Sequence, residues 1–341
     1  MIKIKFKSKM VIPLLIFSAV LGPSISYALT PVEFSVMTWN VGTNSWVLNT
    51  HETKSWNRDK AYINSKYYGN NLAWVPAENA AARHIKNTKP DIIALQELYD
   101  YSECHGGCSL WGCSEFVCNV RSPGDLNRSQ IDLLTNSLGE EYYFMVSATH
   151  PDNGIAVRKS FGEFVPEPII ADDSVILGNV LHDKDTGDHP GRITYAHIKI
   201  RKNNRIIRVV NIHANGTFND DAKKARKRQF DHLFYGDVIS KEYPTIIMGD
   251  FNTDPTSWKC DTKYSPFDDY TDDIFRRGVK NSGLKFLSDP SQDRPATSIS
   301  GLKFDHVVGS PNFKPIAESI DGFPFTGYFD HKPVRVRMLM Y

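Results

Sequence analysis

The sequence has no excess of charge of either sign, with 40 basic and 39 acidic side chains among its 341 residues. Residues 1–28 carry four of the lysines and no acidic residue. Without that segment, 36 basic and 39 acidic residues remain, which is a net charge of about −3. The composition therefore excludes a polybasic protein that holds nucleic acid by bulk charge.

Long apolar runs are also missing beyond the N-terminal segment, and none approaches the ~20 residues of a membrane-spanning helix. There is no internal repeat, heptad pattern, low-complexity tract or linker rich in Pro, Gly and Ser. Intrinsic disorder is excluded because 41% of the residues are hydrophobic and only 23% are charged. We expect one large domain over residues 29–341, with insertions and no transmembrane segment in the mature chain.

The N-terminal segment has the layout of a secretory signal peptide. Residues 1–10 alternate lysine with apolar residues, residues 11–21 are mostly apolar, and Ser26 and Ala28 suit the −3 and −1 positions of a cleavage site. We therefore predict a signal peptide over residues 1–28 and a secreted or periplasmic protein. A buried N-terminal helix and an uncleaved anchor are the alternatives.

The cysteines agree with export. Four of the five lie within residues 104–118, and the fifth is Cys260, which has no obvious partner. Outside the cytosol such clustering favours a loop held by one or two disulfides, whose pairing the sequence does not determine. The alternative is a zinc site assisted by His105, but the spacings lack the CxxC pairs of usual zinc sites.

Hydrophobic periodicity indicates a mixture of strands and helices. Short apolar runs predict strands at residues 34–40, 91–97, 142–147, 155–157, 194–200, 206–213, 245–248, 304–308 and 334–339. Helical spacing and capping predict helices at residues 78–87, 129–138 and 220–234. Because regular βαβ alternation is absent, we expect an α+β arrangement with sheets packed on each other and helices outside.

Polar residues interrupt or follow the apolar strands at six places. They are Asn40, Gln96 with Glu97, His213, Asp250 with Asn252, Asp305, and Asp330 with His331. A carboxylate beside a buried strand is costly unless it is paired or bound to metal. Six such positions predict one site assembled from several strands.

The residue types in this set suit a particular chemistry. Carboxylate and amide oxygens favour Mg²⁺ over zinc, with Mn²⁺ or Ca²⁺ as alternatives. The two histidines can donate to a phosphate or move protons near neutral pH. A hard divalent cation combined with His and Asp pairs indicates phosphoester hydrolysis.

Six short motifs occur in a familiar order: TWNV (38–41), ALQE (94–97), NIHANG (211–216), GDFNTDP (249–255), KFDHV (303–307) and FDHKPV (329–334). With these motifs the chain resembles the endonuclease/exonuclease/phosphatase superfamily. That superfamily includes pancreatic-type DNases, abasic-site endonucleases, bacterial sphingomyelinases, inositol polyphosphate phosphatases and the B subunit of cytolethal distending toxin. The resemblance implies an α/β fold that is a four-layer sandwich, with two packed β-sheets flanked by helices and the site at one end.

The resemblance also implies roles on the metal side of the site. Asn40 and Glu97 correspond to the metal-side pair, with Glu97 as the principal ligand, and Asp330 is a further metal-binding or water-orienting carboxylate. Arg192 corresponds, on a weaker match, to the phosphate-binding arginine of DNases. Water and phosphate would complete the magnesium shell.

The remaining roles concern proton transfer and phosphate binding. By the same resemblance, His331 is the general base and Asp305 fixes its tautomer. Asp250 and Asn252 orient the attacking water and hold the phosphate. His213 donates to a phosphate oxygen or protonates the leaving oxygen. Abasic-site enzymes usually lack this histidine, so it favours the DNase, toxin and sphingomyelinase branches.

Three functions follow from this resemblance. A secreted, metal-dependent endonuclease acting on DNA, or on RNA, is favoured because NIHANG and GDFNTDP are most similar to the toxin B subunit and to DNases. A lipid phosphoesterase acting on phosphoinositides or sphingomyelin, and therefore on a phospholipid head group, is the alternative. A scaffold without activity is the third, and the complete set of site residues argues against it. No feature identifies a partner subunit.

Three features depart from a minimal nuclease. Residues 56–74 form a long insertion between the first two motifs, the Cys-rich stretch 104–118 follows Glu97, and FDH stands where many members have SDH. The basic run at residues 223–228 is either a contact for the DNA backbone or the solvated face of a helix.

Overall fold

Two β-sheets form the centre of the fold. The computed structural model describes residues 30–43, 55–98, 115–116, 134, 137–146, 153–165, 179–180, 192–216, 219–255, 270–291, 295–298, 300–321 and 328–341. Residues 31–341 make up one unit, and the fold given below is that of this unit. The predicted signal peptide, all five cysteines and most of the predicted helix at 129–138 lie outside the described residues.

The first sheet has six strands in the order β12-β13-β1-β2-β4-β3. Its only parallel pair among the described strands is β1 with β2, and the other neighbours are antiparallel. The strands are β1 (Val32–Asn40), β2 (Ile92–Gln96), β3 (Tyr142–Val146), β4 (Gly154–Arg158), β12 (Phe313–Ile320) and β13 (Val334–Met340).

The second sheet has the order β10-β11-β9-β8-β7-β5, and the short β6 also pairs with β7. Here β8 and β9 are parallel, and the other described pairs are antiparallel. The strands are β5 (Gly162–Val165), β6 (Asn179–Val180), β7 (Ile193–Ile200), β8 (Ile206–His213), β9 (Thr245–Asp250), β10 (Lys285–Phe286) and β11 (Asp305–Gly309).

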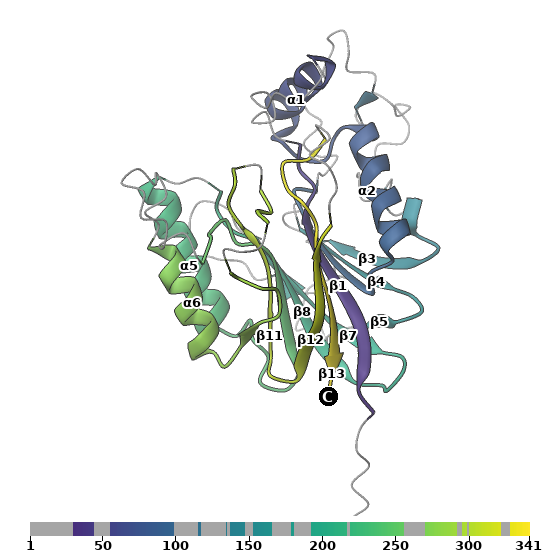
Figure 1. Ribbon diagram of the computed structural model, residues 1–341, viewed down its shortest axis with the longest axis vertical. Helices are drawn as coiled ribbons and strands as arrows, with labels where there is room; N and C mark the ends of the chain where they lie inside the picture. The colour runs from purple at the N-terminus through teal and green to yellow at the C-terminus, as the bar shows by residue number, and fades with distance from the viewer. Residues whose placement is uncertain are drawn as a thin grey trace, which may run out of the picture. The chain divides into compact units, whose positions relative to one another are not determined.

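The central strands are apolar on both faces because each sheet is covered on both sides. Successive side chains of a strand point to opposite faces. Val36 of β1 and Val209 of β8 therefore share the core between the sheets, whereas Met37 packs toward α2 and Val210 packs toward α5 and α6. Figure 1 shows α5 and α6 beside the second sheet and α2 beside the first. The predicted four-layer sandwich is confirmed.

Four helices are described, namely α1 (Ser55–Tyr68), α2 (Val75–Thr88), α5 (Asp220–Tyr235) and α6 (Thr271–Asn281). Helix α5 begins where Asn219 accepts a hydrogen bond from the backbone N–H of Ala222 at 2.8 Å, and two aspartates follow in its first turn. It matches the predicted helix to within a residue. Within the described ranges, no helix is both long enough and apolar enough to cross a bilayer.

Several elements were not expected from the sequence. Helix α1 lies in the insertion at 56–74, and α6 is short and largely polar. Strand β12 is an edge strand with four consecutive exposed residues, a proline and a register shift, so its sequence does not alternate as a half-buried strand should. Helix α2 also begins three residues earlier than predicted, with a proline in its first turn.

Strand pairing brings the polar strand ends together. In the first sheet Asn40 is the register partner of Gln96, because β1 and β2 run parallel. In the second sheet Asp250 is the partner of His213 on one side and of Asp305 on the other. The end residues of β1, β2, β8 and β9 and the first residue of β11 therefore meet at one end of the sandwich.

Candidate active site

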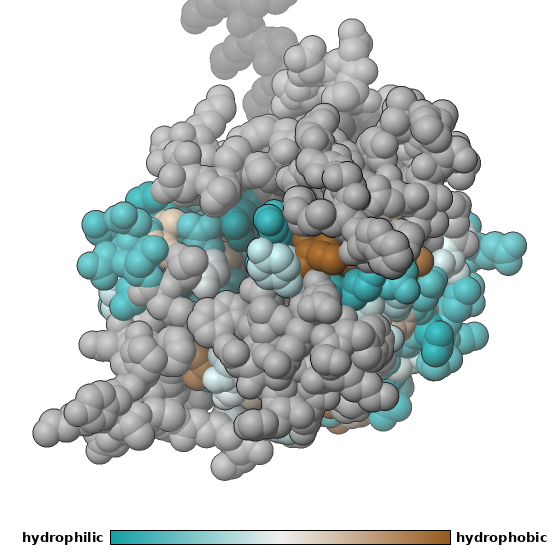
Figure 2. All heavy atoms as spheres, turned by 90° about the horizontal axis from the view of Figure 1, so that it is seen from above, coloured by the Kyte–Doolittle hydropathy of each residue, from teal (hydrophilic) through white to brown (hydrophobic). Residues whose placement is uncertain are grey.

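The candidate residues occupy the end of the sandwich at which β1, β2, β8 and β9 finish. Figure 2 looks onto this end of the molecule, where the described side chains at the left and right of the view are mostly hydrophilic. The candidate carboxylates and imidazoles themselves are at least four-fifths buried. Their geometry is therefore set by protein contacts more than by solvent.

Asn40 joins carboxylates from the two sheets. Its Nδ2 atom donates to Oε1 of Glu97 at 2.9 Å and to Oδ2 of Asp250 at 3.1 Å. Its Oδ1 atom accepts from the backbone N–H of Gly42 at 2.9 Å. Asn40 thus presents a donor to the acidic pair here, whereas the sequence suggested an oxygen ligand. Two buried carboxylates side by side need such a donor between them.

Glu97 is held in an unusual backbone conformation. Its φ of 58° lies in the left-handed region, which costs a non-glycine residue roughly 1–3 kcal/mol. The carbonyl of Glu97 accepts from the N–H of Leu72 at 2.9 Å. A Cβ on Gly42 would lie 1.7 Å from Oε2 of Glu97 and 2.9 Å from the carbonyl of Asn70, so a side chain there would displace this carboxylate. Gly42 was missed from the sequence, because nothing there shows the close approach.

This donor set fits a hard divalent cation. Glu97 and Asp250 bring carboxylate oxygens from different sheets to the same amide, and the missing Cβ of Gly42 leaves space for one of them. Ligand atoms of Asp250, Asp305 and His331 also lie within 4.8 Å of one another. Oxygen-rich sets of this kind are typical of Mg²⁺, Mn²⁺ or Ca²⁺.

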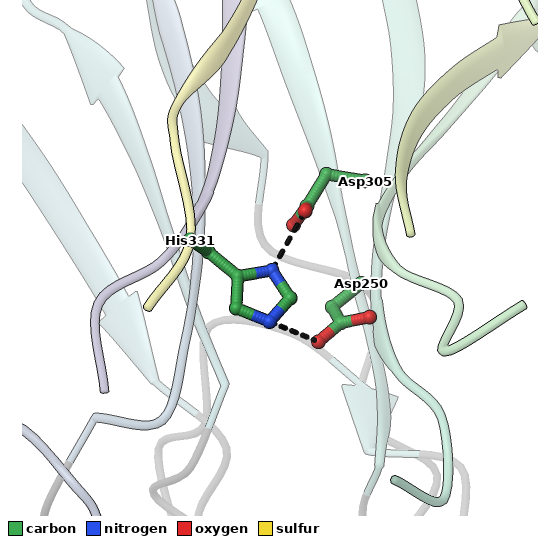
Figure 3. A group of neighbouring side chains, drawn as sticks. All are labelled: Asp250, Asp305 and His331. Carbon is green, nitrogen blue, oxygen red and sulfur yellow. Dashed lines mark hydrogen bonds and ion pairs between the residues drawn. The ribbon is translucent and has the colours of Figure 1, made fainter. Parts of the chain in front are cut away.

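His331 and Asp305 form a buried pair (Figure 3). The Nδ1 atom of His331 lies 2.7 Å from Oδ2 of Asp305, which is fully buried. Because a carboxylate accepts, Nδ1 carries the proton. The other ring nitrogen, Nε2, lies 3.7 Å from Oδ2 of Asp250. Thr297 supports both partners: its hydroxyl accepts from the N–H of Asp305, and its carbonyl accepts from the N–H of Lys332.

The surrounding charges favour the protonated form of His331. Burial alone would lower the pKa of its imidazole, but the charges of Asp305, Asp250 and Asp330 and the hydrogen bond to Asp305 outweigh it. Together they raise the pKa of His331 well above its usual range. Asp330 immediately precedes His331 in the sequence and is itself buried.

His213 faces the same carboxylates. Its Nε2 atom lies 3.6 Å from Oε1 of Glu97 and 4.0 Å from Oδ2 of Asp250. Its backbone N–H donates to the carbonyl of Arg192 at 2.9 Å. Two imidazoles, those of His213 and His331, therefore face one oxygen of Asp250.

Asn252 and Arg192 lie on the loops beside His213. Asn252 has a φ of 48°, and its side-chain amide donates to the carbonyl of Ala214 at 2.9 Å. Its backbone N–H donates to Oδ1 of Asp250 at 2.8 Å. The Nη1 atom of Arg192 lies 3.4 Å from the carbonyls of His213 and Ala214. Both candidates are thus placed beside the site.

The basic run of α5 is not a continuous cationic surface. Arg226 is fully buried, where Nη1 donates to the carbonyl of Asn215 at 2.6 Å and Nε donates to the hydroxyl of Thr271 at 3.3 Å. Lys224 and Lys227 are exposed and pair with aspartates of the same helix. Arg226 therefore ties the loop after β8 to α6.

Comparisons with known proteins agree with this geometry. The model of the Endonuclease/Exonuclease/phosphatase family matches residues 37–324. A search of curated protein sequences found no match.

Solved structures share the fold at low sequence identity. A family protein from Bacteroides vulgatus is 15% identical with a TM-score of 0.56, covering 91% of this chain and 100% of its own. One from Bacteroides thetaiotaomicron is 15% identical with a TM-score of 0.52, covering 92% and 99%. D. rerio TDP2, complexed with single strand DNA product, is 13% identical with a TM-score of 0.51, covering 90% and 98%. The chain belongs to the endonuclease/exonuclease/phosphatase family, whose members are phosphoester hydrolases.

Proposed function

We propose that the protein is an exported, divalent-metal-dependent endonuclease that hydrolyses the phosphodiester bonds of DNA, or of RNA. The observation that carries this proposal is the placement of two imidazoles on one carboxylate. Nε2 of His331 and Nε2 of His213 lie 3.7 Å and 4.0 Å from Oδ2 of Asp250. A phosphodiester needs two proton carriers, because water must be activated and an alkoxide leaving group must be protonated.

Different residues of the chain activate the water and protonate the leaving group in this proposal. His331, with its Nδ1–H held by Asp305, uses Nε2 to accept the proton of the attacking water. His213 donates to a phosphate oxygen or protonates the leaving oxygen. Asp250 and Asn252 orient the water and the phosphate, and Arg192 binds a phosphate oxygen.

The metal-binding residues in this proposal are Glu97, Asp250 and Asp330, with Asn40 holding the first two in place. A bound divalent cation supplies charge neutralisation and orients the phosphate. Neutralising Asp250 and Asp330 would weaken two of the charges that raise the pKa of His331, and the hydrogen bond to Asp305 would remain.

Nucleic acid is favoured over lipid by the site motifs. The NIHANG and GDFNTDP sequences are most similar to those of DNases and the toxin B subunit. His213, in the first of these motifs, faces Glu97 and Asp250, and it suits either class of substrate. Export rests on the signal-peptide layout of residues 1–28.

Plasmid nicking tests the proposal. The exported protein is incubated with supercoiled plasmid in Mg²⁺, in chelator, and as the His213→Ala and His331→Ala variants. His197→Gln is the matched control. His197 is a buried histidine of β7, and it accepts a hydrogen bond from Arg208 of the neighbouring strand β8. We expect nicking by the wild type and the control, and its loss in the other three samples.

Absence of nicking by folded protein under every divalent metal overturns the nuclease proposal. The same preparations are then assayed on sphingomyelin and phosphoinositide vesicles. Cleavage there, lost in both histidine variants, would assign the same residues to a lipid phosphoesterase.

A further inference from the structure

Trp39 makes a long-range contact with the segment that carries His331. It is the residue before Asn40 on β1 and is completely buried. Its indole Nε1 donates to the backbone carbonyl of His331 at 3.2 Å, across 292 positions of sequence. The first sheet is thus bonded directly to the backbone of the proposed general base.

The backbone at His331 has limited support from regular structure. His331 precedes β13, which begins at Val334, and its strand pairing with the described residues is an isolated bridge to Ser298. Its ring donates from Nδ1 to Asp305 at 2.7 Å, and Nε2 faces Asp250 at 3.7 Å, which is longer than a hydrogen bond. The position of Nε2 therefore also depends on where the backbone is held.

Trp39 is itself fixed on two sides. Its ring makes an edge contact with Phe329 at a centroid distance of 4.7 Å and with His84 of α2 at 5.3 Å. Nε2 of His84 in turn lies 3.3 Å from Oδ2 of Asp321. One indole therefore holds the segment before β13 at two points, the ring of Phe329 and the carbonyl of His331.

A buried indole N–H needs an acceptor in any protein core, so the bond could serve stability alone. The group that accepts the indole hydrogen bond distinguishes a stabilising role from a positioning role. Trp74 is equally buried, but its Nε1 donates to a carboxylate, Oε2 of Glu115, at 3.2 Å, whereas Nε1 of Trp39 donates to the backbone of a site residue. We propose that Trp39 is a positioning residue, whose indole N–H holds the backbone of His331 so that Nε2 faces the reacting phosphate.

This inference rests on the proposed function, in which His331 is the base. The test compares Trp39→Phe with Trp74→Phe, since each removes one indole N–H from a buried site and keeps an aromatic ring. We expect Trp39→Phe to lower kcat roughly 10-fold or more, because small misplacements of a catalytic group are costly, with KM and Mn²⁺ affinity unchanged. Trp74→Phe should keep kcat within about 2-fold of wild type, because positions that do not hold a reacting group add little to the barrier.

A second readout does not depend on activity. The Nδ1 proton of His331, bonded to Asp305, gives a downfield NMR signal that is assigned by its loss in His331→Ala. We expect this signal to shift or broaden in Trp39→Phe and to stay in place in Trp74→Phe. If Trp39→Phe does not fold, replacing Trp39 with benzothienylalanine removes the N–H and keeps the bicyclic shape.

Equal kcat in the two tryptophan variants, with an unchanged His331 signal, overturns the positioning role. A wild type that hydrolyses no phosphoester, with the His331 signal moving in Trp39→Phe alone, overturns the proposed function and leaves the positioning of His331 standing.

Discussion

The side-chain amide of Gln96 donates to Oδ1 of Asn211 at 2.7 Å, from one sheet to the other. Gln96 immediately precedes Glu97, and Asn211 lies two residues before His213. The amide of Asn211 also donates to the carbonyls of Leu95 and Gly154, at 2.8 Å each. A buried polar clasp, made by Gln96 and Asn211, therefore fixes the strand that leads to Glu97 against the strand that ends in His213.

Replacing Gln96 with leucine should open this clasp. Oδ1 of Asn211 would remain buried without its donor, which costs about 1–3 kcal/mol of unfolding free energy. Thr38→Val is the matched control, because it removes the other acceptor of Gln96, at 3.2 Å, and keeps the bond between the sheets. Urea unfolding and kcat are measured for both. Equal losses in the two variants would contradict a special role for the clasp between the sheets.

Replacing Asp305 with asparagine removes the negative charge beside His331 and keeps the size and shape of the side chain. Asparagine can still accept at Oδ1, but it removes the carboxylate that favours Nδ1–H and the imidazolium formed during proton transfer. We expect kcat to fall by about 10²-fold or more, with little change in KM. Asp91→Asn removes a buried carboxylate that pairs with Arg158, so it should cost stability and keep kcat. An unchanged kcat in Asp305→Asn would remove His331 from the role of base.

Divalent metal should stabilise the protein through Glu97. A ligand at 100 times its Kd adds about 2.7 kcal/mol to the unfolding free energy of a protein that binds it only when folded. We therefore expect Mn²⁺ or Mg²⁺ to raise Tm in wild type and in Glu78→Gln, a buried glutamate of α2, and to have little effect in Glu97→Gln. Differential scanning calorimetry in chelator and in metal checks this. An equal rise of Tm in Glu97→Gln would place the metal elsewhere.

Much of the fold could be predicted from the sequence, and so could the set of polar residues that the strand pairing brings to one end of the sandwich. Strands such as β1 and β8 are buried on both faces, so their apolar runs stand out, and each ends in a polar residue such as Asn40 or His213. A polar side chain at the end of a buried strand can be recognised from the neighbouring residues in the sequence. Its recognition does not require knowing which strands pair with each other.

Relationships through space could not be predicted in the same way. The glycine that makes room for Glu97 and the indole that holds His331 depend on approaches between distant segments. Helix α1 was missed because it lies in an insertion, and Arg226 was missed because a basic run normally indicates a solvated helix face. In each case the neighbours, and not the residue type, determine the role.

Arg226 should behave unlike the other cations of α5. Arg226→Met leaves the carbonyl of Asn215 without its buried donor and should lower the unfolding free energy by about 3 kcal/mol. Lys224→Ala changes an exposed side chain and should stay within about 0.5 kcal/mol of wild type. Neither change should alter the salt dependence of plasmid nicking. A weaker salt dependence in Lys224→Ala would show that this helix face contacts the nucleic acid backbone.

His306 should make the protein less stable in mild acid. It is fully buried among phenylalanines of α6, β10 and the loop after β9. Burial lowers its pKa to about 4. The charge of Lys303 also lowers this pKa, and the charge of Asp254 opposes the shift. Its Nε2 atom bonds the carbonyl of Lys303 at 2.8 Å. The unfolded chain binds a proton at about pH 6.5, whereas the folded chain does not until about pH 4. Stability is therefore full above the unfolded pKa and falls as the pH drops below it.

The expected loss from His306 between about pH 7.5 and pH 5 is about 2 kcal/mol. His306→Gln can keep a donor to the carbonyl of Lys303 and has no such titration, so its unfolding free energy should lose about 2 kcal/mol less than wild type over this range. Urea unfolding is measured in chelator, so that protonation of the metal-side carboxylates is the same in both proteins. If the two proteins lose stability in parallel, His306 takes up a proton in the folded state, and the packing of its ring against Phe275 and Phe286 does not exclude the imidazolium.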